Sequence, residues 1–388
     1  MKYIEKLLNG AEVKWMPLGE VAEIYGGLTG KSKADFEDGN ALFVSYKNIY
    51  DNYEIDVHNL ARVKVSDDER QNKIEYGDIL FTGSSETAED VAFSSAVTSV
   101  LKEPVYLNSF SFGIRFNKGV EMMPEFCKHL FRGSVMRKQL KLTASGVTRF
   151  NVSKARFKRV LVPIPPLRLQ EEIVRILDKF TTLEAELEAE LDCRKRQYEY
   201  YRNQLLSLDV ISNKGKLNNV EVVTLGEIVT IKNGKTYKHL STGNIPVYGS
   251  GGIMCYVDQY VYDKPTVLIP RKGSLENIFY LDKPFWNVDT IYYTEIKDNI
   301  IMPKFLYHYL INQHLEKLNL AGGVPSLTQK VLNNVPVPIP PLAEQQRIVS
   351  ILDKFEALTT SISEGLPKEI ALRRKQYEYY RNQLLSFA

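Results

Sequence analysis

The sequence predicts an α+β protein in which two β-rich domains alternate with two long helices. The main observation is an internal duplication: the eleven residues QYEYYRNQLLS occur at positions 197–207 and again at 376–386. Two shorter blocks precede each copy, PIPPL at 163–167 and 338–342, and ILDKF at 176–180 and 351–355. Eleven consecutive identical residues do not arise from composition alone, so the chain contains a repeated unit.

Each copy of the repeat predicts one long helix. A Pro-Pro pair precedes it, Gln and Glu occupy its early turns, and apolar residues follow at alternating spacings of three and four. These apolar residues begin with Ile173, Ile176 and Phe180 in the first copy and with Ile348, Ile351 and Phe355 in the second. Matching apolar seams favour pairing of the two helices with each other. The alternative is that each helix packs only on its own domain.

The second helix differs from the first in length. It has four more residues between its ILDKF and QYEYY blocks, and Gly365 and Pro367 lie in this longer stretch. A proline inside a helix removes a main-chain hydrogen bond and its ring clashes with the preceding turn. We therefore expect the second helix to be kinked or interrupted, and the two-fold symmetry of the pair to be imperfect.

The repeat also sets the expected domain boundaries. They are a first domain at residues 1–160, a helical region at 161–210, a second domain at 211–337 and a helical region at 338–388. Both domains share a strand, turn and strand pattern containing LGE (13–27 and 220–234), which a short amphipathic helix precedes in the first domain. Both also share SGVTRF or GGVPSL near the end (145–150 and 322–327), with short β-branched and aromatic runs in between. The middles diverge, so a common scaffold is expected to present two different surfaces.

Composition indicates a globular protein of at least two domains, since the chain has 388 residues, 44% of them hydrophobic and 25% charged. No apolar run approaches the ~18 residues that span a bilayer, and the first ten residues do not resemble a signal peptide, so a cytoplasmic location is expected. Cys127, Cys193 and Cys255 lie far apart, which disfavours a disulfide framework or a zinc site. The net charge is only +3, so any nucleic-acid surface must be local.

No motif in the chain predicts catalysis. The stretch YGGLTGKS at 25–32 is close to a nucleotide-binding loop, but Tyr25 occupies the place of the first glycine that such a loop requires. The five histidines show no metal-binding spacing, and His129 and His308, which match inside a predicted helix, are expected to be structural. No glycine-rich loop for a dinucleotide or S-adenosylmethionine occurs, and no NPPY-like tetrapeptide for attacking a base amino group. We expect the chain to have no cofactor of its own.

Basic residues favour contact with DNA instead. Residues 126–160 contain ten Lys or Arg and no Asp or Glu. Both domains also carry a glycine turn that contains a lysine, and the main-chain amides of such a turn suit a phosphate. Basic side chains mixed with Ser, Thr, Asn and Tyr suit both phosphates and base edges. The alternative is a solvated basic face. The candidate DNA-contacting residues are Lys31, Lys33, Tyr46, Lys47, Thr82, Ser84, Ser85, Arg149 and Lys154 in the first domain, and Lys232, Lys235, Lys238, Tyr248, Arg271, Lys272 and Ser326 in the second.

With these motifs the whole chain resembles the specificity (S) subunit of type I restriction–modification systems. The resemblance rests on LGE at the start of each domain, on PIPPL leading into RLQEEIVRILDKF and AEQQRIVSILDKF, and on the repeated QYEYYRNQLLS. It implies that the domains are target recognition domains, each of which recognises one half of a split DNA sequence. It also implies that the two helices form an antiparallel coiled coil, which sets the spacer between the half-sites and docks two modification subunits.

The resemblance further implies recognition without catalysis. Adenine methylation, with its S-adenosylmethionine, would belong to the modification subunits, and cleavage to restriction subunits of the full complex. Identical surfaces suit two copies of one partner, so Arg202, Gln204, Arg381 and Gln383 in the repeated RNQLLS ends are the candidate partner-binding residues. Two alternatives are a stand-alone two-headed DNA-binding protein and an enzyme with a hidden active site.

Overall fold

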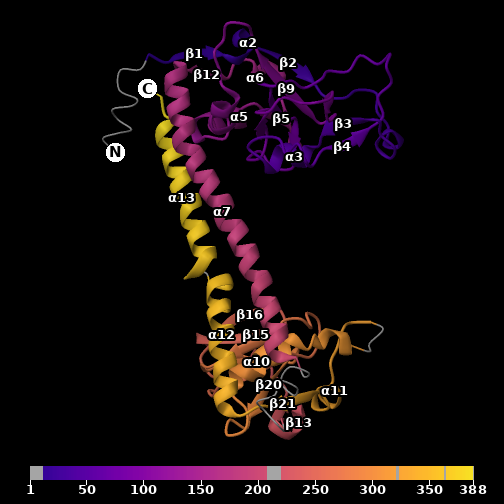
Figure 1. Ribbon diagram of the computed structural model, residues 1–388, viewed down its shortest axis with the longest axis vertical. Helices are drawn as coiled ribbons and strands as arrows, with labels where there is room; N and C mark the ends of the chain where they lie inside the picture. The colour runs from indigo at the N-terminus through magenta and orange to yellow at the C-terminus, as the bar shows by residue number, and fades with distance from the viewer. Residues whose placement is uncertain (1–11, 208–219, 320–322, 362–363, 388) are drawn as a thin grey trace. The chain divides into compact units, whose positions relative to one another are not determined.

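The computed structural model describes residues 12–207, 220–319, 323–361 and 364–387 of the chain (Figure 1). The chain forms two compact units. The first unit comprises Met1–Glu186 and Ile370–Ala388, and the second comprises Leu187–Glu369. Each unit therefore contains one β-rich domain, the beginning of the helical repeat that follows it, and the end of the other repeat. We refer to the β-rich parts as domain 1 (residues 12–164) and domain 2 (residues 220–339).

Both domains open as the sequence predicts, with a strand, a turn and a strand. In domain 1, β1 (Lys14–Pro17) is followed by one helical turn, α2 (Leu18–Val21), and by β2 (Ala22–Gly26). In domain 2, the same order is β13 (Glu221–Thr224), α9 (Leu225–Ile228) and β14 (Val229–Lys232). The predicted turn is thus the LGE-containing helical turn, whose leucine is fully buried in both copies. The amphipathic helix expected before residue 13 lies outside the described residues.

The PIPPL block closes each domain against its first strand. β12 (Leu161–Ile164) pairs antiparallel with β1, and β21 (Pro336–Ile339) pairs antiparallel with β13. These two-stranded ribbons are short because the Pro-Pro pair that follows ends each strand. They place the start of each helical repeat directly beside the start of its domain.

Domain 1 is built from an antiparallel four-stranded sheet, a mixed three-stranded sheet and a small third sheet. The four-stranded sheet has the order β2, β9 (Ser111–Phe116), β5 (Ile79–Thr82) and β7 (Ser94–Ala96). The second has the order β4 (Ala61–Val63), β3 (Ala41–Val44) and β8 (Val105–Leu107). The third has the order β10 (Ala144–Ser145), β11 (Phe150–Val152) and β6 (Ser84–Ser85). The helices are η1 (Lys33–Phe36), α3 (Tyr46–Asp51), α4 (Pro124–Leu130), α5 (Ser134–Lys141) and α6 (Lys154–Phe157).

Domain 2 repeats this plan with different lengths. Its four-stranded sheet has the order β14, β20 (Ile291–Ile296), β17 (Thr266–Pro270) and β18 (Phe279–Leu281). Its three-stranded sheet has the order β16 (Gly252–Val257), β15 (Thr242–Gly249) and β19 (Trp286–Asn287). The helices are α10 (Pro303–Asn312), η2 (Leu315–Leu318) and α11 (Gln329–Asn333). The α+β expectation is confirmed for both domains.

An aromatic cluster forms the centre of domain 1. Phe81 and Phe112 stack with ring centroids 5.5 Å apart, while Phe131 and Phe157 meet Phe81 edge-on at 5.2 and 5.1 Å. All four side chains are buried, and each such ring pair contributes about 0.5–1.5 kcal/mol beyond its buried area. This packing fixes β5, and with it the residues that follow β5, against the helices of the domain.

The first helical repeat is one continuous helix and the second is interrupted, as the sequence predicts. α7 runs over Leu167–Leu206, whereas the second repeat is divided into α12 (Leu342–Thr360) and α13 (Gly365–Leu384). Gly365 has a left-handed φ of +78°, and a Cβ there would lie 2.5 Å from the carbonyl oxygen of Ala357. The backbone therefore turns back over the end of α12 in a way that only glycine accommodates without strain.

The two repeats pair with each other within each unit. In the first unit, Phe180 of α7 stacks on Tyr380 of α13 with centroids 5.2 Å apart, and Glu184 forms an ion pair with Arg374. The partner number falls as the α7 number rises, so this pairing is antiparallel. In the second unit, Tyr201 stacks on Phe355 at 5.5 Å. Packing of each helix on its own domain alone is thus excluded.

A buried glutamine anchors each repeat to its own domain. The Gln170 carboxamide accepts a hydrogen bond from the Met123 amide (2.9 Å) and donates to the carbonyl oxygens of Glu121 and Pro165 (2.8 Å each). Gln345 makes the equivalent three bonds, to Met302, Ile300 and Pro340. Both glutamines are fully buried, so each uses its whole amide to satisfy main-chain groups that would otherwise lack partners.

Within the described residues, no helix is both long enough and apolar enough to cross a membrane.

Candidate nucleic-acid interface

Both domains contain a close glycine turn after their second strand. A Cβ at Gly27 would lie 2.0 Å from the carbonyl oxygen of Asn108, and one at Gly234 would lie 2.1 Å from that of Val288. The residue after each glycine donates its main-chain amide to a main-chain oxygen of the neighbouring strand. The donor is Leu28 in domain 1 (2.7 Å) and Lys235 in domain 2 (2.8 Å). Leu28 and Lys235 are therefore the equivalent residues. The glycine turn is shared between the domains, but the lysine is not.

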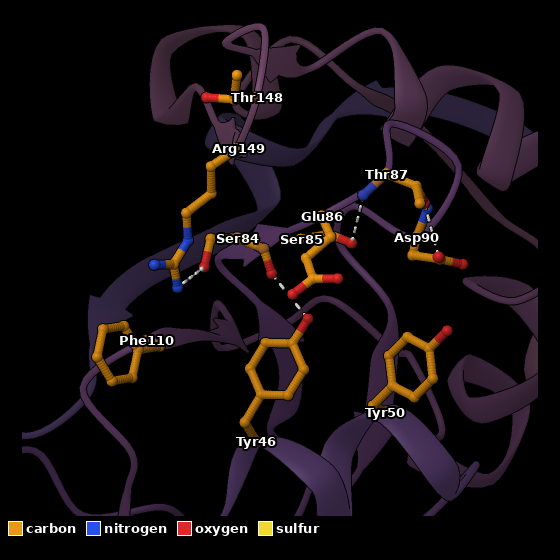
Figure 2. Close-up of a pocket in the computed structure, with 10 residues that line it drawn as sticks. All are labelled: Tyr46, Tyr50, Ser84, Ser85, Glu86, Thr87, Asp90, Phe110, Thr148 and Arg149. Carbon is orange, nitrogen blue, oxygen red and sulfur yellow. Dashed lines mark hydrogen bonds between the residues drawn. The ribbon is translucent and has the colours of Figure 1, made fainter.

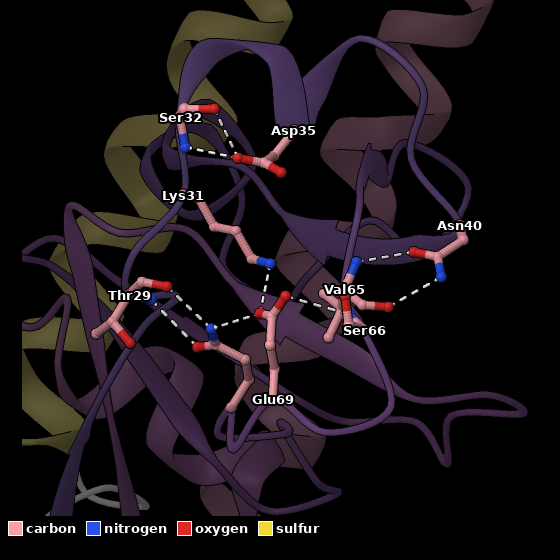
Figure 3. A network of polar contacts seen from close by, with 9 residues as sticks. Thr29, Lys31, Ser32, Asp35, Asn40, Val65, Ser66 and Glu69 are labelled. Atoms are coloured by element: carbon pink, nitrogen blue, oxygen red, sulfur yellow. Dashed lines mark hydrogen bonds and ion pairs between the residues drawn. The ribbon is translucent and has the colours of Figure 1, made fainter.

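Lys31, the first candidate phosphate contact, is engaged inside domain 1 (Figure 3). Its ammonium forms an ion pair with Glu69, and its side chain is only 4% exposed. Hydrogen bonds from Lys31, then from Gln71 and the Ser66 amide, lower the pKa of Glu69 to about 2. Lys31 thus fastens its loop to the segment around Glu69, and its ammonium is not available to a phosphate. Lys33, at the start of η1, is exposed.

Four of the candidates meet in one hollow of domain 1 of about 770 Å³, which we call the Arg149 hollow (Figure 2). The Tyr46 hydroxyl donates to the Ser84 carbonyl oxygen (2.7 Å), and the Arg149 guanidinium donates to the Ser84 hydroxyl (3.3 Å). The guanidinium also lies over the ring of Phe110, 5.7 Å from its centre. The residues that line the Arg149 hollow are Tyr46, Tyr50, Ser84, Ser85, Glu86, Thr87, Asp90, Phe110, Thr148 and Arg149.

Strand pairing holds the two sides of this hollow together. β6 pairs antiparallel with β11, with Ser84 opposite Asn151 and Ser85 opposite Phe150. Arg149 immediately precedes β11, so its direction is set by that register. Burial raises the pKa of Tyr46, whose ring also stacks on that of Tyr50. The hydroxyl of Tyr46 therefore remains a neutral hydrogen-bonding group.

A second hollow of about 350 Å³ adjoins the first and shares Ser84 and Phe110 with it. We call it the glycine hollow, because Gly26, Gly27 and Thr29 line one side of it and Lys154 lines another. Lys154 is exposed and is the first residue of α6, whose N-cap is Ser153. The cation beside the glycine turn is therefore Lys154 and not Lys31.

Two further candidates of domain 1 lie elsewhere. Thr82 is fully buried, and its hydroxyl accepts a hydrogen bond from the Phe93 amide (3.0 Å), so this side chain supports the strand end from inside. Lys47 is exposed on α3, in the turn that begins with Tyr46.

Domain 2 contains a backbone junction equivalent to the pairing of Ser84 with Asn151 in domain 1, but it carries other side chains. Lys272 bridges antiparallel to Ser326, and the Leu327 amide donates to the Arg271 carbonyl oxygen (2.9 Å), as the Val152 amide donates to Gly83 (2.9 Å) in domain 1. Lys272 thus occupies the place of Ser84. Leu327 is therefore structurally equivalent to Val152, whereas the alignment of SGVTRF with GGVPSL pairs it with Phe150. The sequence alignment is thus displaced by two residues from the structural equivalence.

The cations of this junction share one carboxylate. Arg271 and Lys272 both contact Asp289, the lysine at 3.3 Å. The side chains of Arg271 and Lys272 remain 31% and 45% exposed, so both charges are partly offset by Asp289 but still accessible to solvent. A hollow of about 460 Å³ adjoins them, with Gly273, Asn277 and Asn319 among its lining residues.

The remaining candidates of domain 2 are dispersed. Lys232 pairs with Glu295 at 3.4 Å, whereas Lys235 and Lys238 are exposed. The ring of Tyr248 packs on Phe279 with centroids 5.6 Å apart, and burial raises the pKa of its hydroxyl. These residues do not line the hollow beside Lys272.

The candidate partner-binding residues separate into two kinds. Arg202 and Arg381 are half-buried, and each guanidinium lies over a tyrosine of its own helix, at 5.4 Å from Tyr198 and 5.2 Å from Tyr377. Arg381 also donates to the Tyr53 hydroxyl (3.2 Å). Gln204 and Gln383 are exposed. The arginines therefore contribute to packing, and the glutamines face outward.

His129 and His308 are structural, as expected. Each is fully buried, and its Nε2 meets the aspartate of the adjacent ILDKF block, Asp178 at 2.7 Å and Asp353 at 2.9 Å. Burial lowers the pKa of both imidazoles, against the opposing effect of the aspartates. The Nδ1 of His129 meets the Tyr377 hydroxyl at 2.8 Å.

One group in the described part of the chain has the donor atoms for a metal ion. His308, Asp353 and Glu356 bring theirs within 4.8 Å of one another. Lys304 already pairs with Asp353 (2.9 Å), however, and the Tyr307 hydroxyl donates to Glu356 (2.9 Å). The carboxylates are thus engaged by protein groups, and nothing further points to a cation.

Sequence reasoning missed Phe110, Tyr50 and the acids Glu86 and Asp90 of the Arg149 hollow. Contact with phosphate favours cations and hydroxyl groups, whereas three of these four residues are acidic or carry no polar group. An available signal was Phe110 itself, a large aromatic residue between serines; its side chain is 63% exposed.

Comparisons with known proteins agree on one family. The model of the type I restriction modification DNA specificity domain matches residues 11–192 and 218–372. One type I restriction enzyme specificity subunit of Escherichia coli is 32% identical over 430 residues, which cover 100% of this chain and 97% of that protein. Another from Escherichia coli is 29% identical over 394 residues, which cover 94% and 92%.

A solved structure shows the same fold. The S subunit of a type I restriction–modification system from M. genitalium superposes with a TM-score of 0.55 at 18% identity, covering 97% of this chain and 96% of that one. The duplicated domains, their glutamine anchors and these matches lead to one conclusion: the chain belongs to the family of type I restriction–modification DNA specificity subunits, which recognise DNA and are not the catalytic subunits.

Proposed function

We propose that each domain recognises one half of a bipartite DNA sequence through the junction described above. The observation that carries this proposal is the contrast between backbone and side chains. The same main-chain junction presents Ser84 with Arg149 in domain 1 and Arg271 with Lys272 in domain 2. A constant frame with different polar groups suits two different base sequences, because base edges differ in their donor and acceptor patterns.

The glycine hollow supplies the contact that does not depend on sequence. The ammonium of Lys154, beside the glycine turn, suits a phosphate, which fixes the register of a protein on DNA without reading a base. A local cation is sufficient here, since the chain as a whole carries a net charge of only +3.

The partners we propose are two modification subunits, docked on the two copies of the helical repeat. The exposed Gln204 and Gln383 occupy the same place in identical segments, as two copies of one partner require. Methyl transfer to adenine, with S-adenosylmethionine, would take place on those subunits, and cleavage on restriction subunits of the full complex. A stand-alone two-headed DNA-binding protein remains the competing proposal.

Reconstitution followed by sequencing of methylated DNA tests this function. The chain combined with the modification subunits of its system should methylate one bipartite motif, whereas the purified chain with S-adenosylmethionine should methylate nothing. Methylation by the chain alone would contradict the division of labour. Failure to bind any methyltransferase chain on co-purification would favour the stand-alone alternative.

The spacer should depend on the length of α7. This helix contains LEAE twice in succession, at 183–186 and 187–190. A third LEAE adds about 6 Å of helix and a rotation of about 40°, against roughly 3.4 Å per base pair of DNA. We expect the insertion variant to methylate a motif with a longer spacer, by between one and two base pairs, and with unchanged half-sites. An active variant with the original spacer would show that the helix does not measure it.

A further inference from the structure

The charges in the Arg149 hollow do not suit a phosphate. Two carboxylates, Glu86 and Asp90, line it together with the single guanidinium of Arg149 (Figure 2). Asp90 accepts a hydrogen bond from the Thr87 hydroxyl (2.6 Å). Glu86 is exposed and makes no hydrogen bond or ion pair to any residue in the described part of the chain. Arg137 lies near Asp90 on the protein side, but the lining itself carries two carboxylates and one guanidinium, which disfavours a phosphate. A base edge that carries an amino group would meet a free acceptor.

The guanidinium of Arg149 is held in place without being neutralised. It lies over Phe110 and donates to the Ser84 hydroxyl at 3.3 Å, and it has no carboxylate partner among the residues that the structure describes. Arginine has five N–H donors in a planar fork, so most of them remain available. A side chain held by packing loses less entropy when it binds than a free one.

Resting on the function proposed above, we propose that the Arg149 hollow recognises a G·C base pair in the major groove. Arg149 binds the O6 and N7 atoms of guanine, and Glu86 accepts a hydrogen bond from the N4 amino group of cytosine. A G·C pair displays these two acceptors and this donor on one edge, and arginine with guanine and glutamate with cytosine are the matching side-chain pairs.

Domain 2 supports the assignment by contrast. Its junction carries Lys272 in place of Ser84, and Asp289 is already shared by Lys272 and Arg271. The adjoining hollow has Glu276 and Glu316 among its lining residues but no arginine. The combination of a free guanidinium with a free carboxylate therefore belongs to domain 1. The recognition of this base pair should affect one half-site only.

The experiment determines the methylated motif of the reconstituted complex for the wild type and for Arg149→Ala, Arg149→Lys and Glu86→Gln. The wild-type motif should contain a G·C pair in one half-site. Arg149→Ala should reduce discrimination at that position by about 5- to 150-fold, the range of one bidentate base contact. Arg149→Lys should not restore it, because an ammonium lacks the fork. Glu86→Gln should weaken discrimination at the same position.

Lys154→Ala is the matched control. It removes one positive charge from the adjoining glycine hollow, so it should weaken binding and its salt dependence while the motif stays unchanged. The other half-site is an internal control in every variant. Arg149 and Glu86 are both exposed, so these substitutions should leave the thermal unfolding of the chain unchanged.

The outcomes separate this inference from the proposed function. A wild-type complex that methylates no bipartite motif would overturn the function itself. A bipartite motif without a G·C pair in at least one half-site, or one that Arg149→Ala leaves unchanged, would overturn only the role of the Arg149 hollow. Loss of discrimination at both half-sites would also contradict it.

Discussion

The two domains are alike in the residues that fix their backbones and different in the side chains at the junction proposed to bind DNA. Gln170 and Gln345 make the same three hydrogen bonds, and Gly27 and Gly234 face carbonyl oxygens at nearly the same distance. At the junction, by contrast, the buried Ser84 is replaced by Lys272, whose side chain is partly exposed. The two glutamines satisfy buried main-chain groups and the two glycines leave room for a neighbouring backbone, and few other residues can do either. The side chains at the junction carry no such constraint and can follow a different DNA sequence.

The two units differ at one buried site, the histidine that contacts the ILDKF aspartate. His129 Nδ1 meets the Tyr377 hydroxyl, whereas His308 Nδ1 is buried with no hydrogen-bond partner among the described residues. The corresponding tyrosine of the second unit is Tyr198, from the other copy of QYEYY. Identical sequence therefore gives a completed hydrogen bond in one unit only.

The sequence offers a reporter for each domain. The chain has two tryptophans, Trp15 on β1 and Trp286 on β19. A Trp286→Phe background reports unfolding of domain 1, and a Trp15→Phe background reports domain 2. Both backgrounds serve for the three stability predictions that follow.

The largest effect is expected from Gly27→Ala and Gly234→Ala. The added Cβ would meet a backbone oxygen 2.0 or 2.1 Å away, and backbone cannot move aside as a flexible side chain can. Each variant should lose more than about 3 kcal/mol in urea unfolding of its own domain. Gly26→Ala and Gly251→Ala are controls, since a Cβ there meets nothing within 4 Å. A normal midpoint for either test variant would show that the turn can relax.

The next effect is expected from Gln170→Leu and Gln345→Leu. Each substitution leaves one amide and two carbonyl groups of the domain without their partner, at a cost of about 2–4 kcal/mol. The two losses should agree within about 1 kcal/mol if the anchors are equivalent. Gln346→Leu, at an exposed neighbouring position, should change little. Unequal losses would show that one domain has a second means of attachment.

Equivalent tyrosine-to-phenylalanine substitutions should destabilise the two units by different amounts. Tyr377→Phe removes the hydroxyl that His129 meets at 2.8 Å, so it should cost the first unit about 1 kcal/mol. Tyr198→Phe should cost the second unit less, because His308 Nδ1 has no partner to lose. Urea midpoints in the two single-tryptophan backgrounds measure both values. Equal costs would indicate that Tyr198 and His308 do form this bond in solution.

The smallest effect concerns binding. Arg271→Ala with Lys272→Ala should flatten the dependence of DNA affinity on salt by about one charge, since Asp289 already offsets one of the two cations. Between 50 and 200 mM salt this amounts to about a 3- to 4-fold difference in affinity. Asp289→Asn should change the slope in the opposite direction. An unchanged slope in both variants would place the junction away from DNA.

Much of the fold could be predicted from sequence because its signals are local. Apolar spacing over a few turns indicates a helix, and a glycine followed by proline indicates its interruption, as at Gly365. The opening strands and the structural roles of His129 and His308 followed from comparison of one repeat with the other. The offset of two residues between SGVTRF and GGVPSL was missed, because only hydrogen bonds across the sheet reveal it.

The sequence by itself determined the duplication, the helices with their interruption and the β-rich domains, since these depend on neighbours along the chain. Only the tertiary structure decided which polar residues are free to bind. Lys31 is held by Glu69 and Arg149 lies against Ser84, partners 38 and 65 residues away. No local pattern encodes such a distance, because it is set by the register of strands paired from distant segments. Whether a cation is neutralised or exposed depends on that register.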